Sequence, residues 1–223
     1  MRVPVELEVE STQLPVRGRR APRISGEERE RSILLTAERL LDHRPLHEIS
    51  VDDLARGAGI SRPAFYFYFA SKERVLLSLL DRLVQDQLQA ERDAPGNLAD
   101  NPALAWWHVL GSSHARWSAH RGVLRAAMQA RTTSTEVREV WRQLLDRFVE
   151  RTAAAIEAER ARGAAPPGLP ARDLAICLVR MNEKVFEAMA SDAQPTIPED
   201  RTLDALVGVW LSAIYGTTPF PTA

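Results

Sequence analysis

Serines at positions 25, 50, 61 and 71 each precede a segment whose apolar residues recur at the spacing of an α-helix. A serine oxygen in that place accepts a hydrogen bond from a backbone N–H of the first helical turn. Ser25 and Ser50 are followed three residues later by Glu28 and Asp53, the spacing of a reciprocal capping box. Closely spaced helix starts leave little room for strands, so residues 25–72 are predicted to form a group of short helices.

Longer helical patterns occupy the rest of the chain, after a loop expected at residues 93–97. They run over 102–117, 120–131, from Ser134 to near Gly163, 171–190 and 198–216. The alternation typical of strands is sustained nowhere. The sequence therefore predicts an all-α fold with a small N-terminal three-helix unit and a larger C-terminal helical bundle.

Residues 50–72 predict a helix-turn-helix, the arrangement with which many proteins enter the major groove of DNA. Ala55 is small enough for a second helix to cross it closely. Gly59 or Gly57 can supply the positive φ that the turn requires. Ile60 is expected to anchor the turn in the core. The second helix, which begins after Ser61, would present its N-terminal end and one face to DNA.

All five residues at 65–69, at the end of that helix, carry aromatic rings, and they are too many to face inward together. Phe65 and Phe69 are assigned to the core, whereas tyrosine hydroxyls can reach phosphates and aromatic rings can meet thymine methyl groups. Lys72, beside the first N–H groups of the next helix, is predicted to bind phosphate. The candidate DNA-binding residues are Ser50, Ser61, Arg62, Ala64, Tyr66, Phe67, Tyr68, Lys72, Arg20 and Arg23.

The net charge of −1 alone would argue against nucleic acid, but the charge is unevenly distributed. Residues 11–75 hold 12 basic against 9 acidic residues, and Arg17, Arg19, Arg20 and Arg23 cluster without an acid between them. Such a cluster favours binding to the phosphate backbone of a nucleic acid. A solvated tail is the alternative interpretation of a short basic run. Residues 1–24 are expected to be a mobile basic arm.

The stretch from Asp52 to Glu73, DDLARGAGISRPAFYFYFASKE, resembles the TetR family of bacterial transcriptional regulators. The resemblance implies a nine-helix protomer with DNA-binding residues 25–72, a ligand-binding and dimerisation domain over 73–217 and a tail at 218–223. It also implies a homodimer formed through helices 171–190 and 198–216. A C2 dimer would read a near-palindromic operator whose half-sites lie about 34–36 Å, or a multiple of that distance, apart.

All five tryptophans follow residue 100, which suggests either a large-residue core or an aromatic cavity in the bundle. Further stretches resemble one family member that has an apolar tunnel in its bundle. The resemblance implies that Trp106, Trp141, Asn182 and Trp210 of this chain line such a tunnel. The full candidate set for a small hydrophobic effector is Trp106, Ser113, Trp117, Trp141, Leu145, Phe148, Asn182, Phe186 and Trp210. Ser113, Arg151 and Glu187 stand where that member has apolar residues, so a smaller or more polar pocket is expected.

The resemblance implies a two-state repressor: an effector that prefers the state with another recognition-helix spacing would release the operator. An enzyme is disfavoured, because the five histidines lack ligand spacing and no hydrolase or phosphate-loop motif occurs. Cys177, the single cysteine, is expected to be an inert buried thiol. No cofactor, metal or membrane span is expected, and the cytoplasm is the default compartment. A helical ligand-binding protein or an enzyme without DNA binding remains the alternative.

Overall fold

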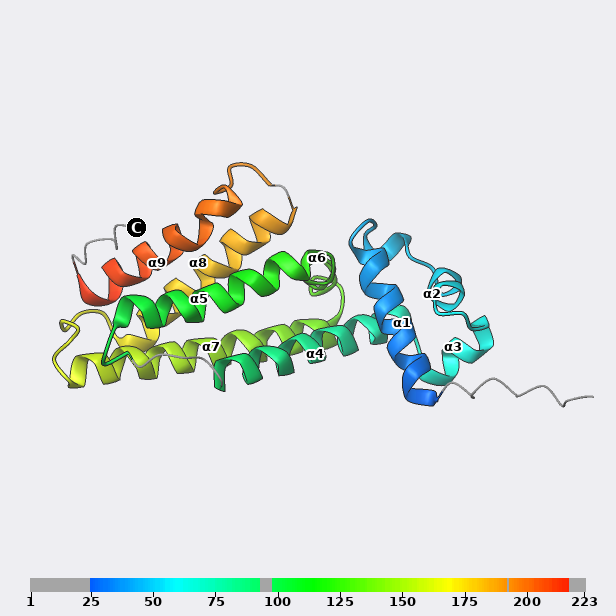
Figure 1. Cartoon of the computed structure of the whole chain (residues 1–223), viewed down its shortest axis with the longest axis horizontal. Coiled ribbons are helices and arrows are strands. Elements are labelled where there is room, and N and C mark those ends of the chain that lie inside the picture. Colours follow the sequence, from blue (N-terminus) through cyan, green and yellow to red (C-terminus); the bar gives the residue numbers. More distant parts are fainter. Residues whose placement is uncertain (1–24, 93–97, 192, 217–223) are drawn as a thin grey trace, which may run out of the picture.

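A computed structural model describes residues 25–92, 98–191 and 193–216 of the chain. The expected basic arm with Arg20 and Arg23, the loop at 93–97 and the tail at 218–223 lie outside these residues. Within them the chain forms nine α-helices, one short 3-10 helix and no strand, which confirms the all-α prediction. Figure 1 shows a small group of helices at one end of an elongated bundle.

The N-terminal group begins where the serine pattern placed it. Ser25 forms the capping box with Glu28, Ser50 forms the one with Asp53, and the oxygen of Ser61 accepts from the backbone N–H of Ala64. The elements are α1 (Gly26–Leu41), η1 (Leu46–Glu48), α2 (Val51–Gly57) and α3 (Arg62–Tyr68). The 3-10 turn η1, which the sequence pattern does not reveal, continues the chain between α1 and α2.

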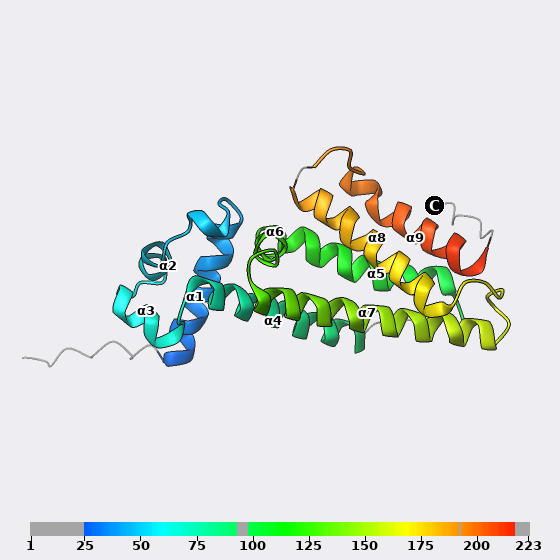
Figure 2. The same cartoon turned by 180° about the vertical axis from the view of Figure 1, so that it is seen from behind.

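The bundle consists of α4 (Lys72–Arg92), α5 (Pro102–Ala119), α6 (Arg121–Ala130), α7 (Thr135–Ala161), α8 (Ala171–Ser191) and α9 (Glu199–Tyr215). Helix α4 leaves the N-terminal group and runs on into the bundle without interruption (Figures 1 and 2). The short α6 lies at the bundle end that faces α1. Helices α7 and α8 pack along each other, as do α5 and α9.

Two glycines shape the helix-turn-helix for different reasons. Gly59 has φ of +69°, a left-handed conformation that most side chains avoid, so it is the turn residue. Gly57 lies where α2 crosses α1, and a Cβ there would come within 2.3 Å of a methyl carbon of Thr36. Ile60 packs its side chain against the core, as the sequence predicted.

Besides the continuous helix α4, contacts between α1 and α6 join the N-terminal group to the bundle. Gly122 of α6 lies so close to the end of α1 that a Cβ would meet the backbone carbonyl carbon of Leu41 at 2.5 Å. Arg125 donates from Nη2 to the carbonyl oxygen of Leu41 at 2.9 Å. His120 Nδ1 and Glu38 Oε1 form a third link, 2.5 Å apart. A shift of α6 therefore acts directly on the backbone of α1.

Candidate DNA interface and effector cavity

The aromatic residues of α3 divide between the core and the solvent. Phe65 is fully buried and Phe69 is 6% exposed, as predicted. Tyr66 is 47% exposed and Phe67 is 90% exposed, although both lie in the same helix. Tyr68 is half-buried against the core. Phe67 therefore presents its ring to solvent next to the exposed Tyr66.

The polar groups around α3 are partly engaged with one another. Nη1 of Arg62 lies 3.4 Å from Oδ2 of Asp52, and both side chains are exposed. A hydrogen bond with Tyr66, and then the charge of Asp52, raise the pKa of Arg62 above its ordinary value. Ser61 and Ser50 are engaged as helix caps, and Ala64 is half-buried beside them. This face therefore presents aromatic rings, hydroxyl groups and a guanidinium.

Lys72 has a structural role that the sequence analysis missed. Its Nζ donates to the carbonyl oxygens of Leu46 at 2.8 Å, His47 at 3.2 Å and Ile49 at 2.9 Å. An ammonium group has three N–H donors, so these bonds use its full capacity. In this structure Lys72 thus closes the loop around η1 onto the start of α4. Its predicted phosphate contact stays a prediction.

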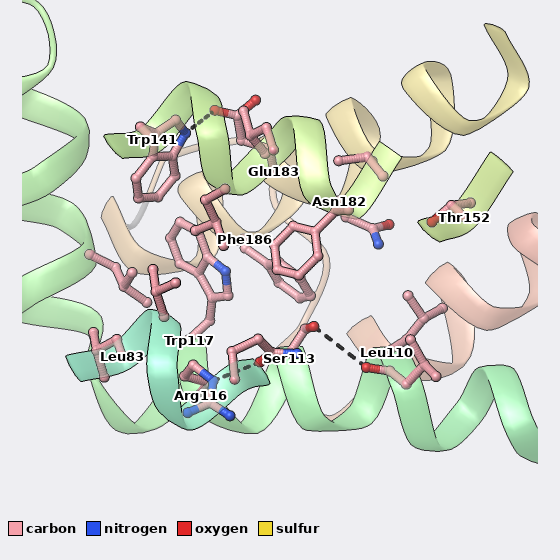
Figure 3. Close-up of a pocket in the computed structure, with 18 of the residues that line it drawn as sticks. Leu83, Leu110, Ser113, Arg116, Trp117, Trp141, Thr152, Asn182, Glu183 and Phe186 are labelled. Carbon is pink, nitrogen blue, oxygen red and sulfur yellow. Dashed lines mark hydrogen bonds between the residues drawn. The ribbon is translucent and has the colours of Figure 1, made fainter. Parts of the chain in front are cut away.

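A cavity of about 900 Å³, counted out to its open mouth, lies between helices of the bundle. Figure 3 shows aromatic side chains from α5, α7 and α8 facing one another within it. Most of the lining is apolar, as in typical small-molecule sites. Of the nine predicted effector residues, the lining contains Ser113, Trp117, Trp141, Leu145, Phe148, Asn182, Phe186 and Trp210.

Trp106, the ninth predicted residue, is buried but does not line the cavity. Its indole nitrogen donates to the hydroxyl of Tyr215 at 3.1 Å, and its ring centroid lies 4.9 Å from that of Trp210. Tyr215 in turn donates to Glu159 at 2.8 Å. Trp106 thus packs against Trp210, where the hydrogen bond to Tyr215 holds it outside the cavity lining. Its assignment as an effector contact stays a prediction.

Of the three residues expected to make the cavity more polar, only one lines it. Ser113 lines the cavity, but Arg151, which is exposed on α7, and Glu187, which is half-buried on α8, do not. Glu187 instead pairs with Lys184 at 2.5 Å. Val179 contributes another apolar wall residue. The cavity consequently stays open and mainly apolar.

Four polar wall residues went unnoticed in the sequence: Gln87, Arg116, Thr152 and Glu183. Glu183, which is 5% exposed, accepts hydrogen bonds from Arg131, from Nη1 of Arg180 at 2.9 Å and from Nε1 of Trp141 at 2.8 Å. Burial by itself raises the pKa of Glu183, but these hydrogen bonds outweigh it and hold the pKa below its usual value. The charged wall group is thereby neutralised within the protein, as a buried carboxylate requires.

The amide and guanidinium of the lining each have one neutral partner. Oδ1 of Asn182 accepts from the indole nitrogen of Trp210 at 3.0 Å, which supplies the partner that the sequence analysis required. Arg116 donates from Nε to Oε1 of Gln87 at 2.7 Å. Burial lowers the pKa of Arg116, and the charge of Asp86 partly offsets the effect. The sequence signal that could have drawn attention to Arg116 is its place next to Trp117, one of the effector candidates.

Cys177 is exposed on α8, contrary to the expectation of a buried thiol. Its helix is apolar on more than one face, so periodicity could not show which face is covered within a single chain. Across residues 25–92, 98–191 and 193–216, no group of His, Cys, Asp and Glu side chains is placed to hold a metal ion. None of the helices in these ranges is long and apolar enough to cross a membrane.

Comparison with known proteins identifies the family. Residues 33–79 match the family described as bacterial regulatory proteins, tetR family, and residues 106–216 match the C-terminal domain of the transcriptional regulator EthR. The HTH-type transcriptional regulator EthR of Mycobacterium tuberculosis is 50% identical over 201 residues, which cover 90% of this chain and 93% of that protein. The chain belongs to the TetR family. As a TetR-family protein it is a DNA-binding transcriptional regulator, and the prediction from the helix-turn-helix is confirmed.

Other relatives of this TetR-family protein agree. EthR of Mycolicibacterium smegmatis is 45% identical over 207 residues, which cover 93% of this chain and 95% of that protein. The crystal structure of a TetR-like transcriptional regulator from Rhodococcus sp. RHA1 superposes with a TM-score of 0.62 at 25% identity, covering 86% of this chain and 98% of that one. The relatives are named as regulators, in line with the prediction that the chain is not an enzyme.

Proposed function

We propose that the protein is a homodimeric repressor that binds a near-palindromic operator and leaves it when a small apolar effector enters the bundle. The observation that carries the proposal is the exposure of aromatic rings on α3: Phe67 is 90% exposed beside Tyr66, whereas Phe65 is fully buried. We place the action of the repressor in the cytoplasm, where bacterial DNA lies.

The DNA-binding face would comprise the exposed side of α3 and the start of α2. Phe67 suits contact with a thymine methyl group, and Tyr66 suits a phosphate or base edge. Arg62 would exchange Asp52 for DNA, since an exposed pair at 3.4 Å holds it only weakly. Ser50 and Ser61, as caps of the helix ends, would place backbone N–H groups near phosphates.

The effector site would be the cavity, with Asn182 as a polar group among apolar walls. Trp117 stacks on Phe186 with ring centroids 5.6 Å apart, and Trp117 meets Trp141 edge to face at 6.0 Å. These rings offer an apolar molecule a large contact area. Leu124 brings α6 into the same lining.

The dimer interface would consist of α8 and α9. Cys177 on α8 and Val209 and Ala213 on α9 are exposed although their helices are rich in apolar residues. A second copy related by a two-fold axis would cover both helices and place the two recognition helices side by side.

The coupling would pass through α6. This helix contributes Leu124 to the cavity wall, while Gly122 and Arg125 touch the end of α1. An effector that fits better when α6 has moved would also favour a different placement of the N-terminal group. The operator spacing would then be lost in that state.

The test is a binding titration of the full chain with DNA from upstream of its own gene, with salt varied and competitor DNA present. Specific binding should survive the competitor and weaken steeply with salt. Phe67→Ala, Tyr66→Ala and Arg62→Ala should each weaken specific binding, by about tenfold for a base contact. Leu169→Ala, which removes an exposed apolar side chain at the far end of the bundle, is the matched control.

If Phe67→Ala and Tyr66→Ala bind the operator as well as the unchanged protein does, α3 is not the recognition helix. If no specific DNA binding occurs at all, the chain is better described by the second candidate, a helical ligand-binding protein. The mainly apolar cavity between the bundle helices is the observation that would favour that candidate.

A further inference from the structure

The hydrogen-bond donors and acceptors of the cavity wall differ in how many of them already have a partner within the protein. Its carboxylate and the oxygen of Asn182 are in use as acceptors: both oxygens of Glu183 accept from arginine or tryptophan, and Oδ1 of Asn182 accepts from Trp210. Donors are in surplus. No hydrogen bond to another described residue engages the indole N–H of Trp117 or the terminal nitrogens of Arg116.

Arg116 is the wall cation without a carboxylate partner. Among the described residues no carboxylate lies within salt-bridge distance of its guanidinium, whose bond from Nε goes to the neutral amide oxygen of Gln87 at 2.7 Å. Asp86 acts on it only through space, from the exposed side of α4. Glu183, the wall anion, already has Arg131 and Arg180. Of the two charged residues in the lining, Glu183 is thus paired directly, whereas Arg116 has no direct ion pair with a described residue.

The position of Arg116 also fits one end of an elongated ligand. Figure 3 places it at the border of the cavity on α5, with Thr152 at the opposite side and the ring of Phe186 between them. The indole nitrogen of Trp117, the next residue, is directed toward the interior. A half-buried guanidinium binds a carboxylate more strongly than an exposed one does, because less water competes for it.

We propose, resting on the proposed effector function, that the effector is an amphiphile with a carboxylate head, which Arg116 binds at the α4–α5 edge of the cavity. The indole N–H of Trp117 is a second donor for the head. The tail lies among the apolar residues Leu145, Phe148 and Phe186. A neutral ligand would leave the guanidinium without a counter-charge, and a cationic head would be repelled by it.

The experiment compares three probes with the same tail: dodecanoate, dodecanol and dodecylammonium, each below its micellar concentration. Binding to the full-length protein is measured by calorimetry and by the fluorescence of the cavity tryptophans. Dodecanoate should bind about tenfold or more tightly than dodecanol, the value expected of a charge-assisted hydrogen bond, and dodecylammonium should bind least well.

Arg116→Met should bind dodecanoate and dodecanol equally, with dodecanol affinity changed by about twofold at most. Arg116→Lys should restore part of the preference for the carboxylate. Arg147→Met, which removes an exposed arginine of α7 outside the lining, should behave as the unchanged protein does. Circular dichroism shows whether each variant is folded.

Equal affinity of the unchanged protein for dodecanoate and dodecanol overturns the proposal, and this outcome does not depend on any variant. Tighter binding of dodecylammonium, no binding of any probe, or an unchanged carboxylate preference in folded Arg116→Met overturns it as well. Operator binding by the ligand-free protein is measured in parallel. If the protein binds its operator specifically but shows no preference for the carboxylate, this inference alone is refuted. If the protein does not bind an operator, the proposed repressor is refuted, and calorimetry still decides which class of ligand the cavity binds.

Discussion

The contact between Gly122 and the end of α1 gives a prediction whose sign depends on the tertiary structure. In Gly122→Ala the new Cβ would lie 2.5 Å from the carbonyl carbon of Leu41 and 2.6 Å from the backbone nitrogen of Asp42. Both are backbone atoms, which cannot rotate away, so α6 must shift from α1. Overpacking of this kind costs about 1–3 kcal/mol.

The opposing effect is the better helix propensity of alanine, which is at most about 1 kcal/mol in a helix interior. Gly122 is the second residue of α6, where the helix is not yet fully formed, so the gain is smaller. The net loss is about 1–2 kcal/mol, which for a chain of this size lowers Tm by about 2–8 °C. Operator affinity should fall with it, since the displaced contact joins the DNA-binding group to the bundle.

The matched control is Gly111→Ala, in the interior of α5. A Cβ there meets only Cδ2 of Leu203, at 3.5 Å, an ordinary contact. Alanine should therefore raise Tm by about 2–4 °C through helix propensity alone. Thermal melts followed by circular dichroism measure both variants. A Gly122→Ala melt at or above that of the unchanged protein would refute the claim that α1 and α6 are held at this distance.

Two further predictions concern buried charges. Glu183→Gln should destabilise the protein by about 3 kcal/mol at pH 7, because Arg131 and Arg180 lose their carboxylate. The pKa of Glu183 is lowered by folding, so the stabilisation is fully present above the ordinary pKa of about 4.3 and is lost as the pH falls through the lowered pKa. Urea titrations should therefore show the stabilities of the two proteins converging as the pH is lowered below about 4.3. Lys72→Met should lower stability by about 1–3 kcal/mol, because three carbonyl acceptors lose their donor. Unchanged stability together with a salt slope of operator binding reduced by about one would instead support the phosphate role of Lys72.

The helices and the DNA-binding motif were predictable because their signals are local. A serine cap and its acid three residues later, as at Ser25 and Ser50, act within one helical turn. Apolar spacing then gave the length of each helix to within a few residues. The short spacing between caps and the glycine-containing turn sufficed to place α2 and α3, and the surplus of rings at 65–69 already required that some of them face solvent.

The cavity could be predicted only in part. Eight of the nine effector candidates line it, because large apolar residues of a bundle gather at its centre. Trp106 is not in the lining, because a residue can lie on the inner face of its helix and still be covered by its neighbours, here Trp210 and Tyr215. Periodicity reports that a face is covered and does not report by what.

The amino-acid sequence by itself determined where the helices begin, that α3 would carry exposed aromatic rings, and to which family the chain belongs. The tertiary structure decided which charged side chains have a partner within the protein and which do not. Lys72 reaches carbonyl oxygens 23 to 26 positions earlier in the chain, Glu183 meets Arg131 from 52 positions away, and Arg116 meets no acid. Such pairings depend on how distant helices cross, and crossing is fixed by the packing of the whole core, which no local pattern encodes.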